Sequence, residues 1–201
     1  CLEQLQQNLT ATIGLASLAL IDGSGSDALK AANIALKHGK QHRRGGISHF
    51  SRDMEFETRA RVRLLQDLRS AFERERLFVV YQPQVRLSDR QLIGVEALLR
   101  WRNDDGSFVA PAQFIPLAES SGLIISLGEW VLRSACHDLH IINQHSAQPL
   151  RMAVNVSVMQ FRQPNFLDVL DRALSESAID PRLLELEITE SVAMLDAGFM
   201  I

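Results

Sequence analysis

Cysteine and long apolar stretches are scarce in this sequence, and each shortage excludes a class of protein. The 201 residues include only two cysteines, Cys1 and Cys136. Two are too few for a disulfide framework and lack the paired spacing of a structural zinc site. We therefore expect a reducing, cytoplasmic setting. No apolar stretch approaches the roughly 20 residues of a membrane-spanning helix, so we expect no membrane segment within this sequence.

Positive charge is not in excess either. Lysine and arginine total 21 against 24 acidic residues, a formal net charge of −3. Such a chain has no basic field with which to neutralise phosphates, so we expect no DNA or RNA partner. The 46% apolar and 22% charged content is that of a globular protein. The chain opens with Cys1 and ends abruptly at Ile201, which suggests a piece of something longer.

The first fifty residues predict a strand followed by a helix. Residues 10–16 have strand composition, and Gly14 among them permits close packing. The helix has apolar positions at helical spacing from Ala28 onward, with Ser26 or Asp27 as its N-cap. It ends in a basic segment before two glycines, where cations complement the helix dipole.

Residues 53–76 predict a connecting helix. Apolar residues fall on one helical face, opposite charges interleave on the other, and Asp53 is a candidate cap. Such a helix suits a semi-rigid joint between two domains. The heptads are too few to establish a coiled coil, so a homodimer contact stays an open alternative.

Strands and helices alternate in the remainder of the chain. The predicted strands are 77–85, 92–101, 151–157 and 183–190, and the predicted helices are 111–122, 128–143 and 166–177. This alternation indicates βαβ units and an α/β fold with a parallel sheet. Pro116 would cost about 3 kcal/mol in an ordinary helix interior. Either that helix starts late or its kink has a use.

Three of these strands carry an oxygen-bearing side chain that we expect near the C-terminal end of the strand: Glu96, Asn155 and Glu187. In a (β/α) barrel the carboxyl ends of the strands converge on one mouth. Two carboxylates and an amide oxygen there would suit Mg²⁺ or Mn²⁺. For Glu96 taken alone, a simple ion pair with Arg100 is the competing interpretation.

Residues 70–201 resemble the first half of an EAL domain, the family of cyclic-di-GMP phosphodiesterases. The resemblance rests on the order and spacing of five motifs: Tyr81-Gln82-Pro83, Glu96 to Trp101, Phe114 to Glu119, Asn155-Val156-Ser157, and Glu187 to Glu190. It implies a modified, TIM-like (β/α) barrel with one antiparallel strand, present here only in part. The reaction it implies is the hydrolysis of cyclic-di-GMP to linear pGpG by two metal ions.

The same resemblance assigns roles to individual residues. Glu96, Asn155 and Glu187 would be metal ligands and act in catalysis through the metal. Four residues would line the dinucleotide site, with Arg100 on a phosphate: Gln82, Leu98, Arg100 and Pro116. Glu190 would position a nearby loop. The family's Asp-Asp pair, a lysine and a later glutamate would lie beyond Ile201, so we expect this fragment alone to be inactive.

Residues 8–52 resemble the last third of a GGDEF (diguanylate cyclase) domain, through Thr12-Ile13-Gly14, residues 31–36 and Lys40 with Arg44. By resemblance the two basic residues would contact nucleotide phosphates. The expected organisation is a GGDEF remnant at 1–52, a linker helix at 53–76 and half of an EAL domain at 77–201. Two other functions stay open: a catalytically inactive receptor for cyclic-di-GMP, and a surface that only binds partner proteins.

Overall fold

The computed structural model describes residues 10–21 and 23–188. The chain divides into two compact units, residues 1–64 and 65–201. The division falls within helix α2 (Arg52–Glu73), so the predicted linker helix exists. Met54 N donates to Ser51 Oγ at 3.4 Å, which makes Ser51 the residue that caps α2 in place of the predicted Asp53.

Unit 1 contains a two-stranded parallel sheet with a helix packed on it. Its elements are β1 (Ile13–Leu15), the 3₁₀ helix η1 (Leu18–Leu20), α1 (Gly25–His42), β2 (Ile47–His49) and the first part of α2. Ala31 and Ala35 of α1 are buried with Phe50. Gly14 lies so close to α1 that a Cβ there would be 2.2 Å from the carbonyl oxygen of Ala32. The close packing predicted for this glycine is confirmed.

The predicted cap of α1 is wrong. The helix begins at Gly25 with Ser24 as N-cap, and Asp27 occupies the third helical position. There its Oδ2 accepts a hydrogen bond from Ser24 N at 2.9 Å, which forms a capping box. This arrangement satisfies an otherwise unpaired amide at the helix start and extends the helix by about a turn.

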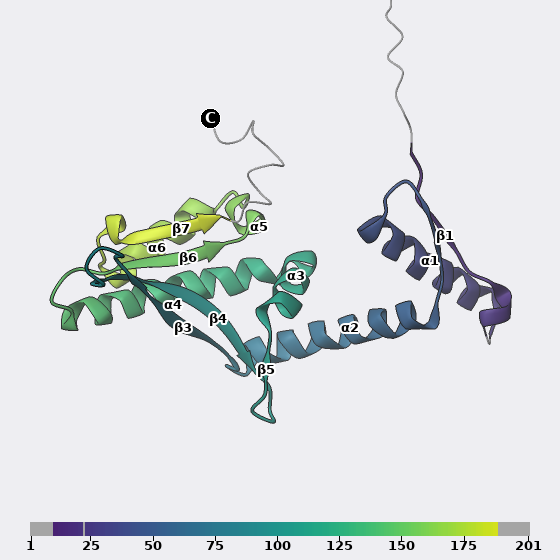
Figure 1. The fold of residues 1–201 in the computed structure, drawn as a ribbon, viewed down its shortest axis with the longest axis horizontal. Coiled ribbons are helices and arrows are strands. Elements are labelled where there is room, and N and C mark those ends of the chain that lie inside the picture. Colours follow the sequence, from purple (N-terminus) through teal and green to yellow (C-terminus); the bar gives the residue numbers. More distant parts are fainter. Residues whose placement is uncertain (1–9, 22, 189–201) are drawn as a thin grey trace, which may run out of the picture. The chain divides into compact units, whose positions relative to one another are not determined.

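Unit 2 is built on a mixed sheet (Figure 1). Its strands are β3 (Leu77–Val85), β4 (Leu92–Arg102), β5 (Phe108–Val109), β6 (Arg151–Val156) and β7 (Leu184–Ile188). The order is β3-β4-β6-β7, with β5 paired to the far end of β4. β4, β6 and β7 are mutually parallel, whereas β3 is antiparallel to β4. The α/β fold is thereby confirmed, but the short β5 is also antiparallel to β4, so the sheet has a second antiparallel strand beside the one that was expected.

Helices cover one face of this sheet. The helices of unit 2 are α3 (Pro111–Ser121), α4 (Leu123–His145), α5 (Val158–Phe161), α6 (Phe166–Ser177) and the 3₁₀ helix η2 (Pro181–Leu183), and α4 and α6 supply the buried residues that pack on this face. Figure 1 shows α4 and α6 running alongside β6 and β7. Their apolar sides meet Val95, Ala97, Met152 and Val154 in the main core. The opposite face of these strands is therefore the one available for chemistry.

Gly122 joins α3 to α4 with no intervening loop. It has φ of 78°, in the left-handed region, and serves as C-cap of α3 and N-cap of α4. The predicted end of α3 is confirmed, but α4 begins five residues earlier than the predicted 128. α3 runs unbroken from Pro111 through Pro116, so the suggestion of a late start is wrong.

No single helix in the described ranges has both the length and the apolar composition to cross a membrane. Among the helices that the structure describes, α3 and α4 are the one pair that meets that test together, and they are bent by 117° with respect to each other.

Candidate active site

The three predicted metal ligands lie together on the face of the sheet that the helices leave uncovered. Glu96 is paired in register with Ala153, and Asn155 with Glu187. Because side chains alternate along a strand, Asn155 shares the face of Ala153 and therefore that of Glu96. Asn155 Nδ2 donates to Glu96 Oε1 at 2.8 Å. The structure thus brings together side chains from three strands that are far apart in the sequence.

Electrostatic repulsion is concentrated at this cluster. Partial burial raises the pKa of the Glu187 carboxyl, and the negative charges of Glu96 and Glu185 raise it further. Within the described ranges no three His, Cys, Asp or Glu residues form a metal cluster. Two carboxylates and one amide oxygen nevertheless fit part of the coordination shell of a hard divalent cation, whose charge would offset this repulsion.

The position of Glu96 differs from the expectation. It is the fifth residue of the eleven in β4, not near the strand's end. β4 extends past β6 because its last residues pair with β3 and β5. The parallel pairing of β4 with β6 ends at Ala97, one residue after Glu96. Glu96 is therefore close to the C-terminal end of the part of β4 that pairs with β6.

The competing ion pair between Glu96 and Arg100 is not formed. Residues four apart on a strand are separated by about 13 Å, and Arg100 Nη1 instead donates to the carbonyl oxygen of Leu99 at 2.9 Å. Glu96 accepts a hydrogen bond from Asn155 on the neighbouring strand β6 instead. The Glu96 carboxylate is therefore available to bind a metal ion together with Asn155 and Glu187.

A pocket of about 250 Å³ meets the cluster at Asn155, whereas Glu96 and Glu187 do not line it. Leu98, Arg100 and Asn155 line it together with residues of α3, α4 and α5. Gln82 lies directly opposite Glu96 in the register of β3 and β4 and so shares its face.

Two of the four residues predicted for the dinucleotide site, Gln82 and Pro116, do not line this pocket. Pro116 is exposed on α3, and its neighbours Ile115 and Glu119 line the pocket instead. Glu190 lies outside the described residues.

Three polar residues that were not predicted as site residues also line this pocket: Glu119, Ser157 and Gln160. Ser157 is the N-cap of α5, and Gln160 stands three positions later in a capping box. That Ser-x-x-Gln pattern is a local signal that could have revealed the short helix. Glu119 has no such signal, because its partner Ser157 is 38 positions away.

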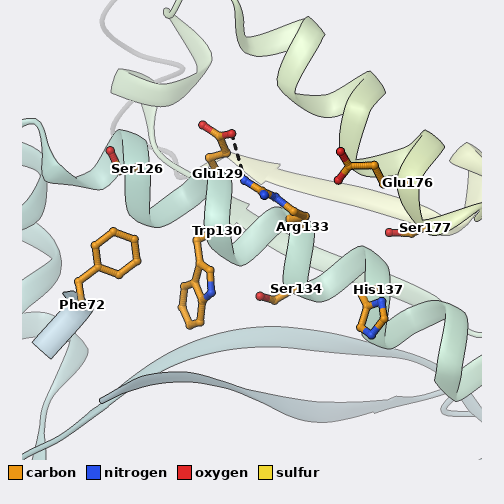
Figure 2. A pocket seen from close by; sticks show the side chains of 9 residues that line it. All are labelled: Phe72, Ser126, Glu129, Trp130, Arg133, Ser134, His137, Glu176 and Ser177. Carbon is orange, nitrogen blue, oxygen red and sulfur yellow. Dashed lines mark hydrogen bonds and ion pairs between the residues drawn. The ribbon is translucent and has the colours of Figure 1, made fainter. Parts of the chain in front are cut away.

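A larger hollow, of about 630 Å³, lies along another side of α4 (Figure 2). None of the predicted ligands lines it. Glu129 and Arg133 pair with each other at 3.2 Å, and the rings of Phe72 and Trp130 meet edge to face. Because the predicted ligands lie elsewhere, the smaller pocket that Asn155 lines is the better candidate for chemistry.

The chain belongs to the EAL domain family, which it matches over residues 65–198. It is 38% identical over 192 residues to the bifunctional diguanylate cyclase/cyclic di-GMP phosphodiesterase MucR of Pseudomonas aeruginosa, covering 94% of this chain and 28% of MucR. It is 34% identical over 187 residues to the cyclic di-GMP phosphodiesterase NbdA of the same organism, covering 92% of this chain and 24% of NbdA.

A solved structure of the PaMucR phosphodiesterase in complex with c-di-GMP shows the same fold. Its TM-score to this chain is 0.64 at 44% sequence identity, over 67% of this chain and 55% of that one. The chain therefore spans about a quarter of the length of these curated relatives and about half of the solved phosphodiesterase chain.

Proposed function

We propose that the complete protein containing this chain is a phosphodiesterase that hydrolyses cyclic-di-GMP to linear pGpG. The observation that carries the proposal is the cluster of Glu96, Asn155 and Glu187 on one face of the sheet, beside a pocket lined by Arg100. Membership of the EAL family and the names of MucR and NbdA support the same substrate and reaction.

Each residue of the cluster has a separate task in this proposal. Glu96 and Glu187 supply negative charge, and Asn155 supplies a neutral oxygen, to hold Mg²⁺ or Mn²⁺. A pair of such ions, when bound, would lower the pKa of the attacking water and stabilise the leaving oxygen. Arg100 binds a phosphate of the dinucleotide through its planar guanidinium. Water adds across one P–O bond, and the ring opens to the linear product.

Leu98, Gln82 and Pro116 complete the proposed dinucleotide site. Leu98 provides apolar surface within the pocket, and Gln82 lies across from Glu96 on β3. Pro116 stands on the exposed side of α3. It would reach the dinucleotide only where a part of the ligand extends beyond the pocket.

We also propose that residues 1–52 are the end of a GGDEF domain. The match to MucR covers 94% of the chain and so includes most of unit 1. Lys40 and Arg44 lie at the basic end of α1, where Arg44 Nε donates to the Lys40 carbonyl oxygen at 3.3 Å. A cytoplasmic location and a homodimer of the complete protein belong to the same proposal.

The test compares the complete reading frame with the 201-residue chain. Each is incubated with cyclic-di-GMP and Mg²⁺, and pGpG is measured by chromatography. We expect hydrolysis by the complete protein and none by the chain alone, whose metal shell is partial. Turnover by the chain alone would contradict the incomplete site. Binding without hydrolysis by the complete protein would replace the enzyme with a cyclic-di-GMP receptor.

A further inference from the structure

Ser157, two residues after Asn155, is held by side chains from two other parts of the chain. Its Oγ donates to Glu119 Oε1 on α3 at 2.8 Å. Its backbone N–H donates to Gln160 Oε1 on α5 at 3.1 Å. The backbone that follows the Asn155 strand is therefore fixed on both sides immediately after the strand ends.

Gln160 is itself held in place by α4. It is one of the few buried polar residues in the described part of the chain, with 7% of its surface exposed. A Cβ added to Gly128 would be 1.7 Å from Gln160 Nε2, so any other residue there would force the Gln160 amide to move. Glycine weakens a helix interior by about 0.5–1 kcal/mol relative to alanine. Glycine at position 128 therefore makes room for the Gln160 side chain, although it lowers the stability of α4.

These contacts join the two parts of the site that come from different elements. Glu119 lies within one helical turn of Pro116 on α3, and Ser157 lies two residues beyond Asn155. The Glu119–Ser157 hydrogen bond links the α3 wall of the pocket to the strand end that carries a predicted metal ligand. Because an amide must be held within narrow limits to serve as a ligand, this link bears directly on Asn155.

We propose that Glu119 is a positioning residue of the active site. It acts through Ser157, whose hydroxyl donates to its carboxylate, to hold Asn155 toward Glu96. The inference rests on the proposed phosphodiesterase function for its kinetic consequence only. Its structural consequence, the fixed orientation of the Asn155 amide, is measurable without any substrate.

The first experiment uses NMR on the 201-residue chain with ¹⁵N-labelled asparagine. The side-chain amide signal of Asn155, assigned by substitution, is compared among wild type, Glu119→Ala and Glu119→Gln. Glutamine keeps an oxygen that can accept from Ser157, whereas alanine has none. We expect the signal to shift or broaden in the alanine variant and to stay at its wild-type position in the glutamine variant.

The second experiment measures hydrolysis of cyclic-di-GMP by the complete protein with the same substitutions. Loss of groups that orient a metal ligand typically costs 10- to 100-fold. We expect Glu119→Ala to raise the Mg²⁺ concentration for half-maximal rate about 10-fold, with KM for the dinucleotide less affected. Glu176→Ala is the matched control, because Glu176 is an exposed carboxylate on α6 and lines the other hollow (Figure 2).

The outcomes separate the two proposals. An unshifted Asn155 signal in Glu119→Ala, or equal impairment in the glutamine and alanine variants, would refute the positioning role whatever the enzyme does. An inactive wild-type protein would refute the phosphodiesterase proposal and leave the NMR test in force. If Glu119→Ala does not fold, Ser157→Ala removes the same hydrogen bond from the donor side and must give the same Asn155 shift.

Discussion

Replacing Gly14 with alanine is expected to destabilise unit 1 selectively. The new Cβ would lie 2.2 Å from the Ala32 carbonyl oxygen and 2.4 Å from the Leu36 backbone nitrogen, against about 3.4 Å for ordinary contact. Both atoms belong to the backbone of α1, so no side chain can turn away to make room. The helix must move by roughly 1 Å from β1, and overpacking of this kind typically costs 1–3 kcal/mol.

The more restricted unfolded chain of the alanine variant offsets about 0.4–1 kcal/mol of that cost. Because the contact is with backbone on two residues, we place the cost at the upper end and expect a net loss of about 2 kcal/mol. That is about a 30-fold shift in the folding equilibrium of unit 1. The buried core of this unit is small, so such a loss is a large part of its stability.

The two units can be followed separately in one sample. Both tryptophans of the sequence, Trp101 and Trp130, lie in unit 2. Tryptophan fluorescence therefore reports on unit 2 during urea unfolding, whereas far-ultraviolet circular dichroism reports on both units. Gly25→Ala is the matched control, because a Cβ there meets no atom within 4 Å. We expect Gly14→Ala to add an early transition to the dichroism curve only, and Gly25→Ala to leave both curves in place. Superimposable dichroism curves for wild type and Gly14→Ala would refute the packing argument.

Three further predictions concern unit 2. Tyr81→Phe removes the hydroxyl that donates to Asp138, and should destabilise unit 2 by about 1–3 kcal/mol in fluorescence-monitored unfolding; an unchanged midpoint would contradict it. Burial raises the pKa of the Cys136 thiol to about 11. The folded state then retains the proton longer than the unfolded state, so stability should fall between about pH 9 and 11. In a Cys1→Ser variant, the single thiol should react with a disulfide reagent at pH 8 only after denaturant is added. Glu96→Gln should abolish Mg²⁺-dependent hydrolysis by the complete protein without lowering its unfolding midpoint, since it removes a repelling charge and keeps an acceptor for Asn155.

Parts of the site that depend on local patterns could be predicted from the sequence. Alternation within 151–157 places Asn155 on one face, and the same rule applies to Glu187 on the neighbouring strand. Glycine at 122 after an apolar helical run correctly marked the end of α3. These features are decided by residues close together in the chain, and a single sequence carries that information.

Other features depended on contacts that no local pattern records. Glu96 lies in the middle of a long strand because β4 changes partners along its length. The hydrogen bond from Ser157 to Glu119 joins residues 38 positions apart. Gly128 was predicted as the start of a helix, but it lies within α4, where its lack of a side chain makes room for Gln160. The N-cap of α1 was predicted wrongly because Ser24, Ser26 and Asp27 are all plausible caps, and only the three-residue spacing from Ser24 to Asp27 decides among them.

The single residue between α3 and α4 constrains how this part of the chain can change its length. With Gly122 as the only joint, no loop exists to absorb an insertion or a deletion. One residue added to α3 would rotate everything before it by about 100° around the helix axis. That rotation would carry Glu119 away from Ser157 and turn Pro116 to another side. Length variation should therefore be tolerated after Arg102, in the turn before β5, and selected against between Pro111 and Gly128.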